Sequence, residues 1–229
     1  MKKLFPVLFI WLIVSCKDKP TQPFSILKVT KTTNGHEFDV QVQSRLSKTD
    51  LVAIASKIKK DSSAYDNIEI DYLLPGNSFK NLGGVTVYAR INYHDARKVT
   101  ALDTVKDLND NFLMFEQVGF APAEAKKLLS YDPADMVGKT VIGKFIDDNT
   151  KTVSLIYSDS KKENQIYILE LDITGKVVSA TEPMMVTHNN VQKLIISPKG
   201  DYMTVQNGML TMYSSDDPET PYRSIKAGL

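Results

Sequence analysis

Glu69 and Asp71 are the two side chains whose types and spacing best suit acid–base chemistry. They stand two residues apart in residues 68–74, where apolar and polar side chains alternate. Alternate residues of a β-strand point to the same face, so both carboxylates should project from one polar surface. Such a pair could act as general acid and general base, or bind calcium. Acids on the polar side of a strand are also common without any such role, and we favour this second interpretation.

Other catalytic and metal-binding patterns are missing from the sequence. The three histidines are far apart, and none has a second ligand at the spacing of a motif such as H-x-x-x-H. They are His36, His94 and His188. Asp95 follows His94 and could orient its imidazole, although a capped loop is the simpler interpretation. There is no G-x-S-x-G nucleophile elbow. We therefore predict no metal centre and no cofactor.

Aromatic and methionine side chains offer a second kind of site. Tyr88, Met184 and Met185 could line a groove for an apolar ligand, because aromatic rings and thioethers adapt to irregular apolar surfaces. Tyr88 alternates with Val87 and Ala89, which predicts that it faces away from them and toward solvent. Packing in the core is the competing explanation for these residues, and we favour it.

The acidic pair belongs to a first stretch, residues 24–95, with the pattern strand, strand, helix, strand, strand. Asn34-Gly35 indicates a hairpin between the first two strands. The segment from Ser47 to Asp50 is typical of a capping box with Asp in place of Glu. The apolar residues behind it recur at helical spacing and are Leu51, Ile54, Ala55 and Ile58. We expect an antiparallel sheet with this helix packed on one face.

Residues 96–136 are predicted to form a helical hairpin that connects two β-rich parts. The apolar stripe of its first helix consists of Leu102, Val105, Leu108 and Phe112. The second helix should begin near Pro122, because proline suits the first turn, and Glu124 suits the positive end of the helix dipole. Pro133 should end this helix.

The remaining residues, 137–229, are β-rich. Seven strands are expected, at residues 140–146, 152–157, 165–171, 177–180, 193–196, 202–205 and 209–213. Short turns separate most of them, which favours sequential antiparallel pairing into a meander or a small open barrel. The predicted fold class of the whole chain is therefore α+β.

The opening of the chain indicates export from the cytoplasm. Lys2 and Lys3 precede an unbroken apolar stretch, residues 4–14, and the small residue Ser15 follows it. These features are typical of a cleaved signal peptide. The apolar stretch is too short for a transmembrane helix, which takes about 20 residues.

The one cysteine of the chain gives this signal a more specific interpretation. Residues 13–16 read IVSC and resemble the lipobox of bacterial lipoproteins. The resemblance implies cleavage between Ser15 and Cys16, and lipidation of Cys16 as the first residue of the mature protein. Residues 1–15 are then the signal peptide, and residues 16–23 are the lipidated cysteine with a polar tether. A transmembrane anchor and a signal cut without lipidation are the alternatives.

Lipidation also predicts where the protein resides. One acyl chain gives only marginal membrane binding, so the two or three chains of a lipoprotein would make attachment permanent. The Lys17-Asp18 pair is compatible with the outer membrane, and the choice between its periplasmic and surface faces stays open. Without Lys2 and Lys3 the chain has 26 basic and 27 acidic side chains. A nucleic acid is therefore not an expected partner, because its recognition calls for a strongly basic surface.

Three functions are compatible with these observations. The leading hypothesis is a lipid-anchored envelope protein without catalysis that binds a partner protein or a small ligand. A structural subunit of an envelope assembly is the second, and it requires an exposed apolar patch. A carboxylate-dependent hydrolase is the third, and it requires Glu69 and Asp71 to lie in a cleft with perturbed pKa values.

Overall fold

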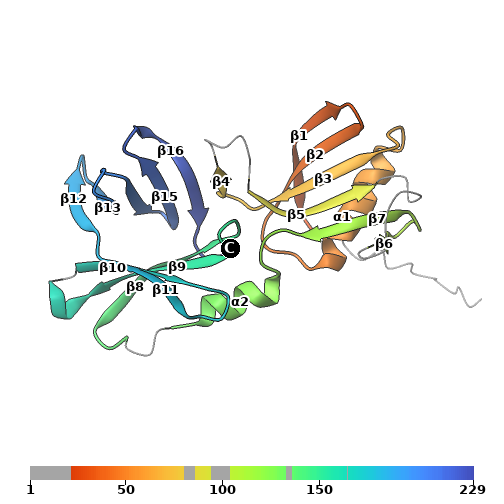
Figure 1. The fold of residues 1–229 in the computed structure, drawn as a ribbon. Coiled ribbons are helices and arrows are strands. Elements are labelled where there is room, and N and C mark those ends of the chain that lie inside the picture. Colours follow the sequence, from red (N-terminus) through yellow and green to blue (C-terminus); the bar gives the residue numbers. More distant parts are fainter. Residues whose placement is uncertain (1–21, 80–85, 94–103, 133–135, 164) are drawn as a thin grey trace, which may run out of the picture.

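The chain folds mainly as β-sheet, in two halves that lie side by side (Figure 1). The computed structural model describes residues 22–79, 86–93, 104–132, 136–163 and 165–229. Within these ranges the chain forms three β-sheets, two α-helices and one short 3₁₀ helix, Ser160–Lys162. The predicted cleavage and lipidation residues, Ser15 and Cys16, lie outside the described residues.

The N-terminal half is a six-stranded sheet with a helix on one face. Its strands, in spatial order, are β1 (Phe24–Thr32), β2 (Gly35–Val42), β3 (Ile68–Leu73), β5 (Val87–Tyr93), β7 (Phe112–Gln117) and β6 (Thr104–Lys106). All neighbouring strands are antiparallel except β2 and β3. These two run parallel because helix α1 (Lys48–Asp61) connects them as a crossover. The sheet is therefore mixed, and the prediction of an antiparallel sheet is wrong for this pair.

Helix α1 forms where the sequence predicts it. The Ser47 hydroxyl oxygen accepts a hydrogen bond from the backbone N–H of Asp50 at 3.2 Å, which satisfies a free donor of the first turn. The expected apolar stripe is buried against the sheet and comprises Leu51, Ile54, Ala55 and Ile58. The Tyr72 hydroxyl of β3 donates to the Leu51 carbonyl oxygen at 2.7 Å, and this bond ties the helix to the sheet.

The predicted helical hairpin over residues 96–136 is wrong in its first half. In place of the first helix, β6 and β7 form a β-hairpin that extends the first sheet. The Asp107 carboxylate stabilises the turn by accepting from the backbone N–H groups of Asn109 at 2.8 Å and Asn111 at 2.9 Å. Asp110 in this turn has a positive φ of 61°. Turn chemistry and pairing of β7 with β5 therefore outweigh the approximate helical spacing of the apolar residues.

The second predicted helix is present as α2 (Pro122–Ser130). The Glu124 carboxylate accepts from the backbone N–H of Ala121 at 2.9 Å, so this acid caps the helix as well as suiting its dipole. Leu102 from the first predicted helix lies outside the described residues, and so does His94.

The C-terminal half contains two antiparallel sheets. The second sheet consists, in spatial order, of β11 (Val177–Thr181), β10 (Gln165–Leu171), β9 (Thr152–Asp159) and β8 (Lys139–Asp147). The third consists of β12 (Met184–His188), β13 (Val191–Ile195), β14 (Tyr202–Gln206), β15 (Met209–Ser214), β16 (Asp217–Lys226) and the short β4 (Ser78–Phe79). All seven predicted strands are present, β10 with the predicted bounds and the other six with changes at their ends, whereas β12 and β16 are not among them.

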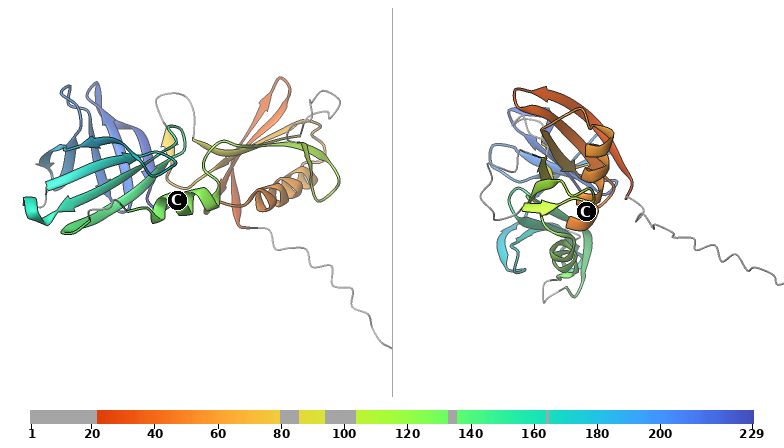
Figure 2. Two further views of the ribbon diagram at one scale, coloured as in Figure 1. Left: turned by 60° about the horizontal axis from the view of Figure 1, so that its bottom comes forward. Right: turned by 90° about the vertical axis from the view of Figure 1, so that its right-hand side faces the viewer.

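The second sheet is covered on both faces, as Figure 2 shows. On one face Leu155 belongs to a core cluster with Ala125 and Leu128 of α2. On the other face Ile156 belongs to a cluster with Leu210 of the third sheet. Neighbouring residues of β9 thus enter two different cores, as the alternation of side chains along a strand requires.

Hydrogen bonds connect the two halves of the molecule. β4 leaves the first half and pairs with β16 of the third sheet. Next to it, the backbone N–H of Lys226 donates to the Asn77 side-chain oxygen at 3.1 Å. Over the described residues the chain is mostly β, with two short helices and no central helical hairpin, so the predicted α+β fold class is wrong. The predicted sequential antiparallel pairing is confirmed in the C-terminal half. The strands nevertheless form two packed sheets in place of one meander or a small open barrel, because each sheet needs a second layer to bury its apolar face.

Candidate functional site

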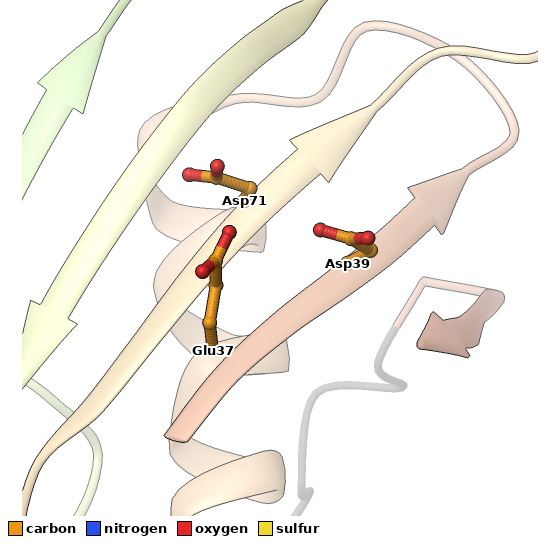
Figure 3. Close-up of side chains that lie close together, drawn as sticks. All are labelled: Glu37, Asp39 and Asp71. Atoms are coloured by element: carbon orange, nitrogen blue, oxygen red, sulfur yellow. The ribbon is translucent and has the colours of Figure 1, made fainter. Parts of the chain in front are cut away.

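The first sheet carries an acidic face on the side opposite α1 (Figure 3). Glu37 and Asp39 of β2 lie beside Glu69 and Asp71 of β3, because the parallel register aligns these residues pairwise. The apolar residues between them point to the other side and are buried beneath α1. The predicted acidic pair is thus joined by two further acids that the sequence analysis did not single out. A period-two alternation in residues 36–42 is the signal that could have shown them.

Arg90 of β5 binds both members of the predicted pair. Its Nε lies 2.6 Å from Oδ1 of Asp71 and 3.1 Å from Oε1 of Glu69. Its Nη2 donates to the second oxygen of Asp71 at 2.9 Å. The hydrogen bond with Asp71 raises the pKa of Arg90 above its usual range, and the charge of Asp71 adds to this effect. We call Glu37, Asp39, Glu69 and Asp71 with Arg90 the acidic face.

This geometry favours charge pairing over acid–base catalysis. Asp71 is only 5% exposed, and both of its oxygens already accept hydrogen bonds from the guanidinium. A general base must reach the proton that it removes from a substrate. A carboxylate that is buried and bidentately bound in this way offers a substrate little access. Arg90 therefore fits a role in neutralising two acids within the sheet.

Three of the acids have the donor atoms for a metal ion. Glu37, Asp39 and Asp71 each place a carboxylate oxygen within 4.8 Å of the others (Figure 3). Carboxylate oxygens suit hard cations such as calcium and magnesium. Asp71 is nevertheless already bound to the positive charge of Arg90, so a metal ion would compete with an ion pair that is in place.

Two cavities among the described residues have volumes of about 180 and 290 Å³. The smaller one adjoins the acidic face and includes His36, whose ring stacks on Tyr65 at a centroid distance of 3.6 Å. The larger one lies beside α2 and includes Arg45 and Leu129. Both are below the range of roughly 300–1000 Å³ that is typical of pockets for drug-sized ligands.

The predicted ligand groove is not assembled from its three residues. Tyr88 has no exposed surface, and its hydroxyl donates to the Leu46 carbonyl oxygen at 2.8 Å, so the prediction that it faces solvent is wrong. A β-bulge skips Tyr88 in the pairing of β5 with β3 and turns it into the core. Burial raises its pKa to about 12. Met184 and Met185 lie in another sheet, on β12.

Only Met184 of the predicted groove residues is strongly exposed. Its side chain is 64% exposed, whereas Met185 packs against the core between the second and third sheets. The exposed residues of β12 also include Val186 at 41%. The structure therefore places an apolar edge here in place of a groove, and His188 ends the same strand.

Sequence reasoning missed a buried ion pair between the two halves. Asp148, which the sequence indicates only as part of a turn, accepts hydrogen bonds from both terminal nitrogens of Arg45 at 2.8 and 2.9 Å. The side chains of Arg45 and Asp148 are 6% and 0% exposed. The adjacent Asp147 pairs with Arg223 of β16. Two consecutive acids at the end of an apolar strand were the available signal, but nothing in the sequence identifies their partners.

No helix in the described part of the chain is long and apolar enough to cross a membrane. The interpretation of the sites rests on the geometry of this chain, because comparisons with protein-family models, curated proteins and solved structures found no match.

Proposed function

We propose that this protein is a lipid-anchored protein of the bacterial envelope that binds a partner protein and does not act as an enzyme. The lipobox resemblance ending at Cys16 supports the anchor, with residues 16–23 as the tether and the outer membrane as its site. The choice between the periplasmic and the surface face of the outer membrane stays open. The small size of the described cavities supports a protein partner over a small ligand.

The two halves are suited to present a binding surface away from the anchor. In the sequence the tether immediately precedes β1. β12 lies in the other half (Figure 1). The halves are joined by the pair of Arg45 with Asp148 and by pairing of β4 with β16. A joint with a buried ion pair and shared sheet hydrogen bonds resists independent movement of the halves. The C-terminal half would therefore keep a defined position relative to the N-terminal half, which follows the tether.

The observation that carries the proposal is the exposed edge of β12. This strand ends the third sheet, so one side of its backbone has no strand beside it among the described residues. Met184 and Val186 are exposed along it, and residues 184–188 read MMVTH, without lysine or an acid. Proteins commonly protect edge strands with lysine or proline within the strand. An unprotected edge is suited to take up an extended segment of a partner as an additional strand.

The acidic face favours a protein without catalytic activity over a carboxylate-dependent hydrolase. Arg90 already binds Glu69 and Asp71, the two residues on which the hydrolase hypothesis depends. A subunit of an envelope assembly could use the same surface, because a permanent partner could also add a strand to β12. The lifetime of the complex distinguishes such a subunit from a protein that binds its partner reversibly.

Site-specific photocrosslinking in intact envelopes tests the binding surface. A photoreactive residue replaces Met184 in the anchored protein, and a control protein carries it at Ile173, which is 58% exposed in a turn of the other sheet. We expect one specific protein adduct from position 184 only. Val186→Lys should abolish it, because a charge at the edge opposes strand addition. The same adducts from both positions, or no adduct, would contradict the proposed surface.

Mass spectrometry of the N-terminal peptide tests the anchor separately. We expect Cys16 as the first residue, with a diacylglyceryl group on its sulfur. Cys16→Ser should leave the signal uncleaved at this bond. An unmodified thiol on the mature protein would disprove the anchor without bearing on β12.

A further inference from the structure

β1 is an edge strand of the first sheet, and it carries three large exposed apolar side chains. Ile26, Leu27 and Val29 are 47%, 55% and 48% exposed. Ile26 pairs with Val40, and Val29 pairs with Phe38, so both lie on the face that α1 covers further along the sheet. Leu27 stands at a break in the register and has no partner in β2. The strand thus extends the apolar side of the sheet beyond its helix.

The tether determines how far β1 can lie from the acyl chains. Seven residues separate Cys16 from Phe24, the first residue of β1. Even a fully extended chain over these eight Cα steps spans at most about 29 Å. β1 is therefore the first described element after the anchor, and its start stays near the bilayer surface.

The charges of β1 match an anionic lipid surface. The strand contains Lys28 and Lys31 and no acidic residue. Apolar side chains interspersed with lysines are typical of segments that lie in the headgroup region of anionic membranes. β12 differs in this respect, because it has exposed apolar residues without lysine. The two edges are therefore suited to different surroundings.

The acidic face limits how the protein can be oriented on an anionic membrane. Lys28 aligns with Asp39, so the side of the sheet opposite α1 becomes negative one strand away from the edge. An anionic surface would repel that side. The side with α1 carries the exposed Lys60, and also Lys57, which pairs with Asp61. A lipid surface would therefore contact the outer edge of β1, which we call its rim, and the α1 side of the sheet.

We propose that the rim of β1 rests in the headgroup layer of the anionic lipid surface to which Cys16 is anchored. Ile26, Leu27 and Val29 contact the lipid, and Lys31, which lies on the same side of the sheet as Val29, binds its phosphates. This orientation rests on the proposed lipidation, and it turns the acidic face away from the membrane. A second copy of the chain pairing along β1 is the competing occupant.

A single tryptophan reports on this contact. The one tryptophan of the chain, Trp11, precedes Cys16 and would be removed with the signal. Leu27→Trp therefore gives the mature lipidated protein one fluorophore, at a site that does not depend on a partner in β2. The protein is reconstituted into phosphatidylglycerol vesicles whose lipids are brominated near the glycerol end of the acyl chains. We expect a blue shift and loss of emission through bromine quenching.

The matched control is Val178→Trp, on β11 of the other half, where the side chain is 54% exposed. Its emission should stay red-shifted and unquenched. Quenching of the Leu27→Trp protein should decrease in phosphatidylcholine vesicles, and also when Lys31→Gln is added. Equal quenching in both lipids would overturn the role of Lys31.

Three other outcomes separate this inference from the proposed function. A Leu27→Trp protein that floats with the vesicles but stays red-shifted and unquenched overturns the contact of β1 and leaves the anchor intact. A blue shift without quenching that grows with protein density shows β1 pairing with a second copy, and this also overturns the contact. Failure of the lipidated protein to float with the vesicles contradicts the proposed anchor itself.

Discussion

Asp148 and Arg45, 103 residues apart in the chain, form a bidentate ion pair between the two halves. Arg45 lies between β2 and α1, and Asp148 directly follows β8. Phe120 closes the arrangement, because its N–H donates to Asp148 at 2.8 Å and its carbonyl oxygen accepts from Arg45 at 3.0 Å. Three distant segments thus meet at one pair of charges with almost no exposed surface.

Arg45→Met should destabilise the protein strongly, because it leaves the Asp148 carboxylate buried without its cation. We expect a loss of about 3–5 kcal/mol in the free energy of unfolding, measured by urea denaturation. Lys57→Met is the control, since Lys57 forms a solvent-exposed ion pair with Asp61. Its loss should be at most about 1 kcal/mol. Similar losses for the two variants would show that the buried ion pair stabilises the protein no more than the exposed one.

Gly119→Ala should disturb the same ion pair by steric overlap. A Cβ atom at Gly119 would lie 2.5 Å from Cγ and from Oδ1 of Asp148, which forces the carboxylate to move. We expect a loss of about 1–3 kcal/mol, again from urea denaturation. In an Arg45→Met background the loss should be smaller, because the ion pair is already broken. Full additivity of the two changes would contradict this coupling.

Arg90→Met should expose the repulsion within the acidic face. Asp71 would remain buried without its guanidinium, next to Glu37, Asp39 and Glu69. We expect a loss of about 2–3 kcal/mol at neutral pH, less than for Arg45→Met because Arg90 is one-third exposed. Glu69→Gln, the control, should change stability little, because it leaves the pair of Arg90 with Asp71 in place. Equal losses for the two variants would contradict the explanation.

Tyr88 should make the protein sensitive to alkaline pH. Burial raises its pKa from 10.0 to about 12, so the folded state keeps the proton that the unfolded chain releases. The contribution of Tyr88 to stability is complete below pH 10 and is lost as the pH rises toward 12. Urea denaturation at several pH values should show this decrease, and Tyr88→Phe should reduce its slope. An unchanged slope in Tyr88→Phe would assign the sensitivity to other tyrosines whose pKa values burial also raises, such as Tyr72 and Tyr93.

Local signals in the sequence predicted many elements well. The Asn34-Gly35 turn separates β1 from β2, and residues 165–171 form β10 with the predicted bounds. The Ser47 hydroxyl caps the helix start as predicted, because a helix start depends on neighbours within one turn. Asp50 does not complete the predicted capping box, since its carboxylate accepts from the Ser47 hydroxyl. The alternation around Glu69 and Asp71 correctly predicted one shared face. Each of these outcomes depends on residues close together in the chain.

Predictions failed where distant segments compete for a residue. The spacing of Val105, Leu108 and Phe112 is compatible with a helix, but pairing with β5 makes this region a β-hairpin. Tyr88 follows the alternation of its neighbours in the sequence, yet a bulge opposite β3 turns it into the core. In both cases the register between strands, which the sequence pattern does not contain, decided the outcome.

The sequence by itself determined the signal-like opening, the position of the single cysteine and most individual strands, because these features depend on local composition and periodicity. Only the tertiary structure decided that Arg90 neutralises Glu69 and Asp71, and that Arg45 meets Asp148 across the two halves. The physical reason is that a buried charge requires a partner at a distance of a few ångströms. Which residue supplies that partner depends on how the sheets are ordered and packed, and not on spacing along the chain.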